Sequence, residues 1–164
     1  MEIAFSIDDI GDRFEYQRSN AHWKTVNHNI ERFRKLRSEH PNIQLQVCTT
    51  VNIFNVYYLE EVAQWNEQQG FDFIYWNMLH DAPHWSISNL PLPAKQQARE
   101  RLMNAQVSDA TREEFYRIMS FMMAGADSDG KELCRQLSLL DHRREQDLAQ
   151  VEPEWAKILE YAKT

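Results

Sequence analysis

The chain has 164 residues, of which 43% are hydrophobic and 26% are charged, and its net charge is -7. This length suits one domain with a packed core, and this balance excludes a disordered chain. The negative charge disfavours a nucleic-acid partner, because duplex binding depends on neutralising phosphates. The sequence shows no apolar run of membrane-spanning length and no signal segment, so we expect no membrane association and a cytoplasmic location.

Two cysteines, Cys48 and Cys134, lie far apart in the sequence. Neither belongs to a CxxC pair or to another metal-type spacing, so the sequence predicts no disulfide framework and no cysteine-bound metal or cluster within this chain. We expect Cys48 to be a buried strand residue rather than a thiol that faces a lumen.

Three segments are predicted to be strands. Residues 2–8 alternate, with Ile3, Phe5 and Ile7 on one face and Ala4, Ser6 and Asp8 on the other. Residues 43–51 also alternate, with Ile43, Leu45, Val47 and Val51 on one face and Gln44, Gln46, Cys48, Thr50 and Asn52 on the other. Residues 71–79 are apolar at nearly every position, which is typical of a strand covered on both faces.

Helices are predicted between these strands. Residues 21–37 carry an apolar stripe at helical spacing, and residues 56–69 begin after Asn55 as a cap and end before Gly70. Residues 9–20 and 80–93 are expected to be loops. Because strand and helix alternate, we predict parallel strands joined by right-handed crossovers.

The remainder of the chain is expected to be helical. We predict a weak, exposed helix over residues 94–105, a second that begins at Ser108 or Asp109, a third over residues 131–150 and a last one opened by Pro153. The fold class is therefore α/β. Residues 1–93 would form a partial (β/α) barrel of about three parallel strands with outer helices, and residues 94–164 a helical C-terminal region packed on it.

Polar side chains end the first two strands. Ser6 and Asp8 end one, and Thr50 and Asn52 end the next. Ligands of parallel α/β sheets bind at the carboxyl ends of the strands. A polar sheet face fits a partial barrel whose lumen holds a polar ligand, and it equally fits a face that simply meets water.

The segment 80–84 contains His80, Asp81 and His84, which are residue types that bind divalent metals. Pro83 separates the histidines and argues against a helical pair of ligands. We therefore predict hydrogen-bonded loop histidines and no metal site, with a metal-dependent enzyme as the alternative.

Several motifs together resemble a known family. Ser6-Ile7-Asp8, the arginines Arg13 and Arg18, and a helix that ends in Arg34-Lys35-Leu36 resemble the fourth βα unit of radical S-adenosylmethionine (SAM) enzymes, above all those with SPASM or twitch domains. Residues 48–55 resemble the fifth strand with the start of its helix, and residues 73–78 resemble the sixth strand. The resemblance covers residues 1–93, and Leu140-Asp141 and Pro153-Glu154 also resemble the tail of twitch-type members.

The resemblance implies a binding site for SAM. Ser6 and Asp8 would bind the ribose hydroxyls, and Arg18 would pair with the carboxylate. The residues that would lie along the adenine or the methionine are Thr50 or Asn52 and Asn77 or Met78.

The cysteine motif of that family, CxxxCxxC, does not occur in this sequence. The resemblance therefore implies a C-terminal portion that contributes the ribose and carboxylate side of the SAM site but is not competent alone. A [4Fe–4S] cluster would require a separately supplied N-terminal half. The implied partners are that half-barrel or a second copy, bound at the open edge of residues 2–8, and a peptide or protein substrate follows by analogy alone. The alternative is a non-catalytic interaction module, either a split-enzyme partner or a dimerising half-barrel.

Overall fold

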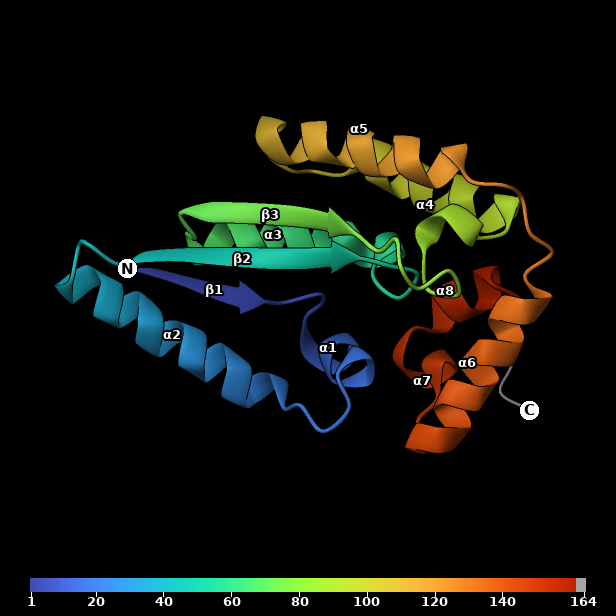
Figure 1. Cartoon of the computed structure of the whole chain (residues 1–164), viewed down its shortest axis with the longest axis horizontal. Helices are drawn as coiled ribbons and strands as arrows, with labels where there is room; N and C mark the ends of the chain where they lie inside the picture. The colour runs from blue at the N-terminus through green and yellow to red at the C-terminus, as the bar shows by residue number, and fades with distance from the viewer. Residues whose placement is uncertain (162–164) are drawn as a thin grey trace.

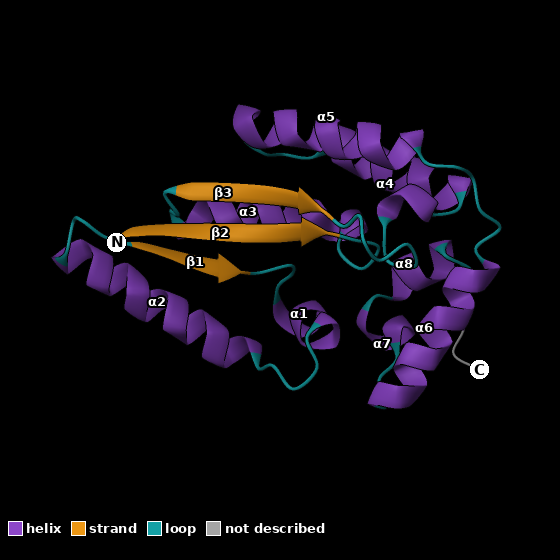
Figure 2. Ribbon diagram, viewed as in Figure 1, coloured by secondary structure: helices purple, strands orange, loops and turns teal. Residues whose placement is uncertain are grey.

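The computed structural model describes residues 1–161. They form a mixed α/β structure with one three-stranded sheet and eight α-helices (Figure 1, Figure 2). The strands are β1 (Glu2–Ser6), β2 (Gln44–Val51) and β3 (Phe73–Met78), and all neighbours are parallel in the order β1-β2-β3. The prediction of three parallel strands with helices between them is confirmed.

One face of the sheet is packed and the other is open. Val47 and Leu45 are fully buried on the packed face, and Val47 belongs to an apolar cluster with Ile30 of α2 (Trp23–Glu39) and Trp65 of α3 (Leu59–Gln69). Burying each such side chain contributes about 1.5–3 kcal/mol. Figure 1 shows α3 behind β2 and β3, and within residues 1–161 no helix covers the near face.

The register places rows of side chains across the open face. Ala4, Gln46 and Phe73 form one row, and Ser6, Cys48 and Tyr75 form the next. Phe73 is 42% exposed and Tyr75 is 49% exposed. The expectation of two covered faces for the third strand is therefore wrong for this part of the chain, because Phe73 and Tyr75 lie on the open face while Trp76 is buried on the packed face.

The segment expected to be a loop over residues 9–20 contains a helix, α1 (Gly11–Gln17). It has no side-chain cap at Ile10, and it is too short to be stable alone. Phe14 and Tyr16 are 3% and 1% exposed, so tertiary burial stabilises the helix. Local sequence signals are therefore weak at this segment.

The C-terminal half is helical, as expected, but it differs in detail. The helices are α4 (Leu92–Asn104), α5 (Asp109–Ala124), α6 (Lys131–Arg144), α7 (Leu148–Val151) and α8 (Pro153–Ile158). The single helix predicted over residues 131–150 is wrong, because Glu145 adopts a left-handed conformation with φ of 55° and ends α6. The exposed character predicted for α4 is also wrong, since Ala94, Ala98 and Leu102 are buried. Ser108 caps α5 as expected, accepting from the Thr111 amide.

Asn55 does not cap a helix through its side chain, contrary to the prediction. A 3-10 helix, η1 (Val56–Tyr58), follows it and leads into α3. A second 3-10 helix, η2 (Ile87–Asn89), interrupts the loop before α4.

The main apolar cluster draws on both halves of the chain. Val51 and Trp76 from the sheet pack in the same cluster as Phe115 of α5 and Trp155 of α8. Trp155 also donates its indole N–H to the Ile53 carbonyl oxygen at 2.7 Å. Among residues 1–161, none of the helices combines the length and the apolar character needed to cross a bilayer.

Candidate functional site

The carboxyl end of β1 brings three predicted site residues together. Asp8 accepts a hydrogen bond from Arg18 Nη2 at 2.6 Å through Oδ2, and the same nitrogen donates to Ser6 Oγ at 2.8 Å. Asp8 Oδ1 accepts from the Thr50 amide at 2.9 Å. The charge of Arg18 is therefore neutralised by a carboxylate of this chain.

Asn55 joins the ends of β1 and β2. Its Nδ2 donates to the Asp8 carbonyl oxygen at 2.7 Å and to the Thr50 carbonyl oxygen at 2.9 Å. Its Oδ1 accepts from the Asn52 amide at 2.9 Å, and the residue is fully buried. Asn55 thus positions three of the predicted site residues. The sequence around Asn55 did not reveal this role, because an asparagine before a helical segment is equally expected as a helix cap.

A cavity of about 210 Å³ opens at this edge of the sheet. We call it the carboxyl-edge cavity, and its lining residues are Asp8, Gln17, Asn52, Phe54, Leu79, Trp85, Leu140 and Arg144. The rings of Phe54 and Trp85 lie 5.2 Å apart between centroids and give it an aromatic wall. Two predicted residues, Asp8 and Asn52, line the cavity, whereas the contributions of α1, the loop after β3 and α6 were not predicted.

The side chain of Asn52 is held in place by three hydrogen bonds. Its Nδ2 donates to Gln17 Oε1 and to the Thr50 carbonyl oxygen, both at 3.2 Å. Its Oδ1 accepts from the Phe54 amide at 2.8 Å. This network connects α1 to the end of β2 and shapes the polar side of the carboxyl-edge cavity.

The two predicted residues of β3 lie on opposite faces of the sheet, and neither lines the carboxyl-edge cavity. Asn77 lies on the open face, where its Nδ2 donates to Cys48 Sγ at 2.8 Å. Met78 lies on the opposite face, because side chains alternate along a strand. Cys48 is partly exposed on the open face rather than buried as expected, and its partial burial together with Asp8 raises the pKa of its thiol.

The three candidate metal ligands of the histidine segment do not converge in the described part of the chain. Within residues 1–161, no three His, Cys, Asp or Glu side chains converge in a way that could hold a metal ion, so His80, Asp81 and His84 are not brought together. The His80 ring packs edge to face against Phe121, with 4.9 Å between centroids. The metal-dependent alternative is not supported by this geometry.

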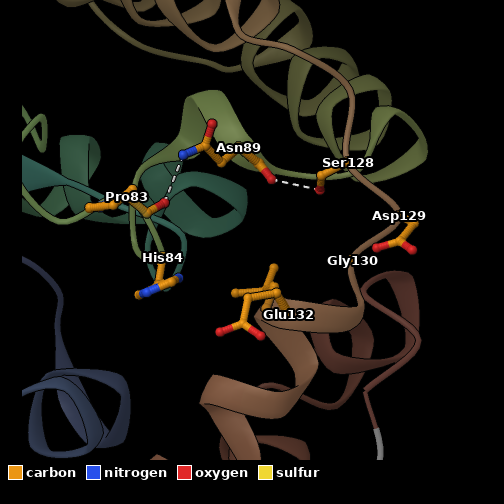
Figure 3. Close-up of a pocket in the computed structure, with 8 residues that line it drawn as sticks. Pro83, His84, Asn89, Ser128, Asp129, Gly130 and Glu132 are labelled. Carbon is orange, nitrogen blue, oxygen red and sulfur yellow. Dashed lines mark hydrogen bonds between the residues drawn. The ribbon is translucent and has the colours of Figure 1, made fainter.

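His84 lines a second cavity of about 210 Å³ between the loop before η2 and the start of α6. Figure 3 shows His84 and Glu132 facing the same space from these two segments. Asn89 donates to the Pro83 carbonyl oxygen and accepts from Ser128 Oγ, each at 2.8 Å, and so ties the walls together. The pKa of the Glu132 carboxyl is lowered to about 2, mainly by the hydrogen bonds that Arg135 donates to it.

A partly buried charged cluster forms around Arg13 of α1 and was not predicted. Arg13 donates to Asp9 Oδ1 at 2.9 Å and to Glu61 Oε2 at 2.8 Å. Burial raises the pKa of Asp9 to about 6, although Arg13 opposes this shift. Glu152 is fully buried, and neither of its carboxyl oxygens has a hydrogen-bond partner in the described part of the chain.

Comparisons of this chain with protein-family models, with curated proteins and with solved structures find no match. A function is therefore proposed from the geometry of the chain itself and from the sequence resemblance to radical SAM enzymes.

Proposed function

We propose that this chain binds SAM at the carboxyl ends of β1 and β2 and forms the ribose and carboxylate side of a radical SAM site, within a partial (β/α) barrel. The observation that carries this proposal is the convergence of Asp8, Thr50 and Asn52 at one edge of an open parallel sheet, next to the carboxyl-edge cavity. Ligands of parallel sheets bind at this edge.

The residues of the cavity fit a ribose and a purine. An ionised carboxylate offers about four acceptor sites, and Asp8 uses one for Thr50 and one for Arg18, so it can still accept from ribose hydroxyls. Phe54 and Trp85 offer an aromatic wall to a planar base. The volume of about 210 Å³ is smaller than the roughly 300–1,000 Å³ of ordinary ligand pockets. The ligand would therefore extend beyond the cavity, and we expect weak affinity.

This chain does not fit the iron–sulfur cluster. It contains two cysteines, Cys48 and Cys134, and a [4Fe–4S] cluster in this family needs three thiolates. A bound cluster would supply the electron that cleaves SAM, and thiolates from outside residues 1–164 would have to hold it. The part of this chain is then to bind and orient SAM, and we propose no turnover by the chain alone.

Titration calorimetry with SAM tests the proposal. We expect binding in the range of about 0.1–1 mM by the unmodified chain, and at least about 10-fold weaker binding by Asp8→Asn, which loses a charged acceptor. Asp12→Asn is the matched control, because Asp12 is an exposed residue of α1 outside the carboxyl-edge cavity. Equal affinities of both variants, or no binding by the unmodified chain at millimolar SAM, would contradict the proposal.

The free edge of β1 favours a second candidate function, an interaction module that completes its sheet with another chain. The Gln44 amide donates to the Met1 carbonyl oxygen at 2.9 Å, and the Ile7 amide donates to the Cys48 carbonyl oxygen at 3.0 Å. Since alternate residues of a parallel strand bond to the same neighbour, the peptide groups of Glu2, Ala4 and Ser6 point away from β2. Such an edge can pair with a second copy or with another half-barrel.

Ala4→Pro tests this second function selectively. The proline removes an outward-pointing N–H and leaves the bonds between β1 and β2 in place. We expect a dimer in light scattering for the unmodified chain and a monomer for Ala4→Pro, with Ala4→Thr as a control that keeps the N–H. A monomeric unmodified chain at about 0.1 mM would contradict pairing with a second copy.

A further inference from the structure

We infer that Arg144, rather than Arg18, binds the anionic group of the ligand in the carboxyl-edge cavity. The inference concerns the same site and therefore rests on the proposed function. It assigns to α6 a direct role in recognising a small ligand with a carboxylate, and for SAM this group is the carboxylate of its methionine part.

Arg18 is not available for that role as the chain is folded. Its Nη2 is 2.6 Å from Asp8 Oδ2 and 2.8 Å from Ser6 Oγ, so the guanidinium already has an anionic partner. Arg18 is also not among the residues that line the carboxyl-edge cavity. Releasing it toward a ligand would leave Asp8 without its countercharge, which costs free energy at a half-buried position.

Arg144 is both positioned and uncompensated. It is the last residue of α6 and lines the carboxyl-edge cavity. Its Nη1 donates to the Tyr16 carbonyl oxygen at 3.0 Å and to the Gln17 carbonyl oxygen at 3.4 Å. These bonds orient the guanidinium without neutralising it, and in the described part of the chain Arg144 forms no ion pair with a carboxylate.

The chemistry of the cavity then matches a ligand with two kinds of group. Asp8 accepts from hydroxyl or ammonium donors, and Arg144 donates to a carboxylate, for which a guanidinium is well suited. SAM carries hydroxyls, an ammonium group and a carboxylate. Binding would thus require α6 to be docked on α1, because the hydrogen bonds to the Tyr16 and Gln17 carbonyl oxygens orient Arg144 at the cavity.

The test compares two ligands on the same variants by titration calorimetry. SAM carries the carboxylate, and 5′-methylthioadenosine has the same nucleoside without it. We expect Arg144→Gln to weaken SAM at least about 10-fold and to leave 5′-methylthioadenosine within about twofold of the unmodified chain. Arg143→Gln is the matched control, since Arg143 is the exposed neighbour on α6, and it should change neither affinity.

Arg144→Lys provides a second variant, because it keeps the charge and should recover part of the SAM affinity. Unchanged SAM binding by Arg144→Gln would overturn the inference, and so would an equal loss for both ligands, which would show a structural role only. If Arg144→Gln does not fold, Arg144→Lys is used instead. A loss of affinity for SAM that exceeds the loss for 5′-methylthioadenosine would then support the inference, and equal losses would overturn it. Binding of neither ligand by the unmodified chain would overturn the proposed function, and the inference with it.

Discussion

The Tyr16 hydroxyl donates a hydrogen bond of 2.8 Å to Asp141 Oδ1 across 125 residues of sequence. Asp141 is fully buried, and its Oδ2 accepts from the Tyr161 hydroxyl at 2.7 Å and from the Leu148 amide at 2.9 Å. This carboxylate therefore fastens α1, α6 and α7 to one another. It also sets the place of Arg144, which follows Asp141 by one turn of α6.

Tyr16→Phe should lower the free energy of unfolding by about 1.5–3 kcal/mol, because a buried hydrogen bond to a charged group is lost. Urea denaturation followed by circular dichroism measures the change. Tyr116→Phe is the control, since Tyr116 is 46% exposed, and it should change stability by less than about 0.5 kcal/mol. Similar small changes in both variants would show that the contact contributes little.

Asn55→Ala should lower the free energy of unfolding further, by roughly 2–4 kcal/mol. It removes the hydrogen-bond partners of two carbonyl oxygens and one amide at the ends of β1 and β2. Asn29→Ala, at an exposed position of α2, is the control. The same denaturation experiment measures both variants. We also expect Asn55→Ala to weaken SAM binding, and full affinity in a folded variant would show that Asn55 does not position Asp8.

The pH dependence of stability should report on Glu152. Burial, and to a smaller degree the charge of Asp9, raise the pKa of Glu152 well above its ordinary value of 4.5. The folded chain therefore keeps this proton to a higher pH than the unfolded chain does. The free energy of unfolding should be highest below about pH 4.5 as far as this group is concerned, and should fall as the pH rises toward the folded pKa.

Glu152→Gln should make stability less sensitive to pH, because an amide resembles the protonated carboxyl group. One proton contributes a slope of up to about 1.4 kcal/mol per pH unit. Urea denaturation at pH 5, 6, 7 and 8 compares the variant with Glu113→Gln, an exposed control on α5. Burial raises the pKa of Asp9 to about 6, so Asp9 also makes the free energy of unfolding fall as the pH rises. Both variants keep Asp9 and therefore keep this contribution. Parallel pH profiles for the two variants would contradict the assignment.

Two glycines should differ in what a side chain costs. At Gly125 an added Cβ would collide with the backbone of Ser88, so Gly125→Ala should destabilise the chain by about 1–3 kcal/mol or more. Gly70 ends α3 with φ of 67°, and an added Cβ would meet only the side-chain end of Arg37 at 4.0 Å, so Gly70→Ala should cost only about 1 kcal/mol of backbone strain. Thermal unfolding measures the stability of both variants. An equal loss of stability would mean that α5 shifts away from Ser88 when the side chain is added at residue 125.

The strand faces were predictable from local patterns, because the alternation in residues 2–8 and 43–51 depends on neighbouring residues only. The helix α1 was not, since Phe14 and Tyr16 are stabilised by distant packing and no cap marks its start. The end of α6 at Glu145 was also hidden, because a non-glycine residue adopts the left-handed conformation there.

The sequence by itself therefore determined three parallel strands and the polar residues at their carboxyl ends. Strand pairing is parallel when helices connect the strands, so Asp8 and Asn52 had to lie at one edge of the sheet. Only the tertiary structure decided that Arg18 pairs with Asp8, that Phe73 and Tyr75 of β3 stay exposed and that Arg144 reaches the cavity. The position of Arg144 depends on how α1 and α6 pack across more than 120 residues of sequence, and no local pattern carries that information.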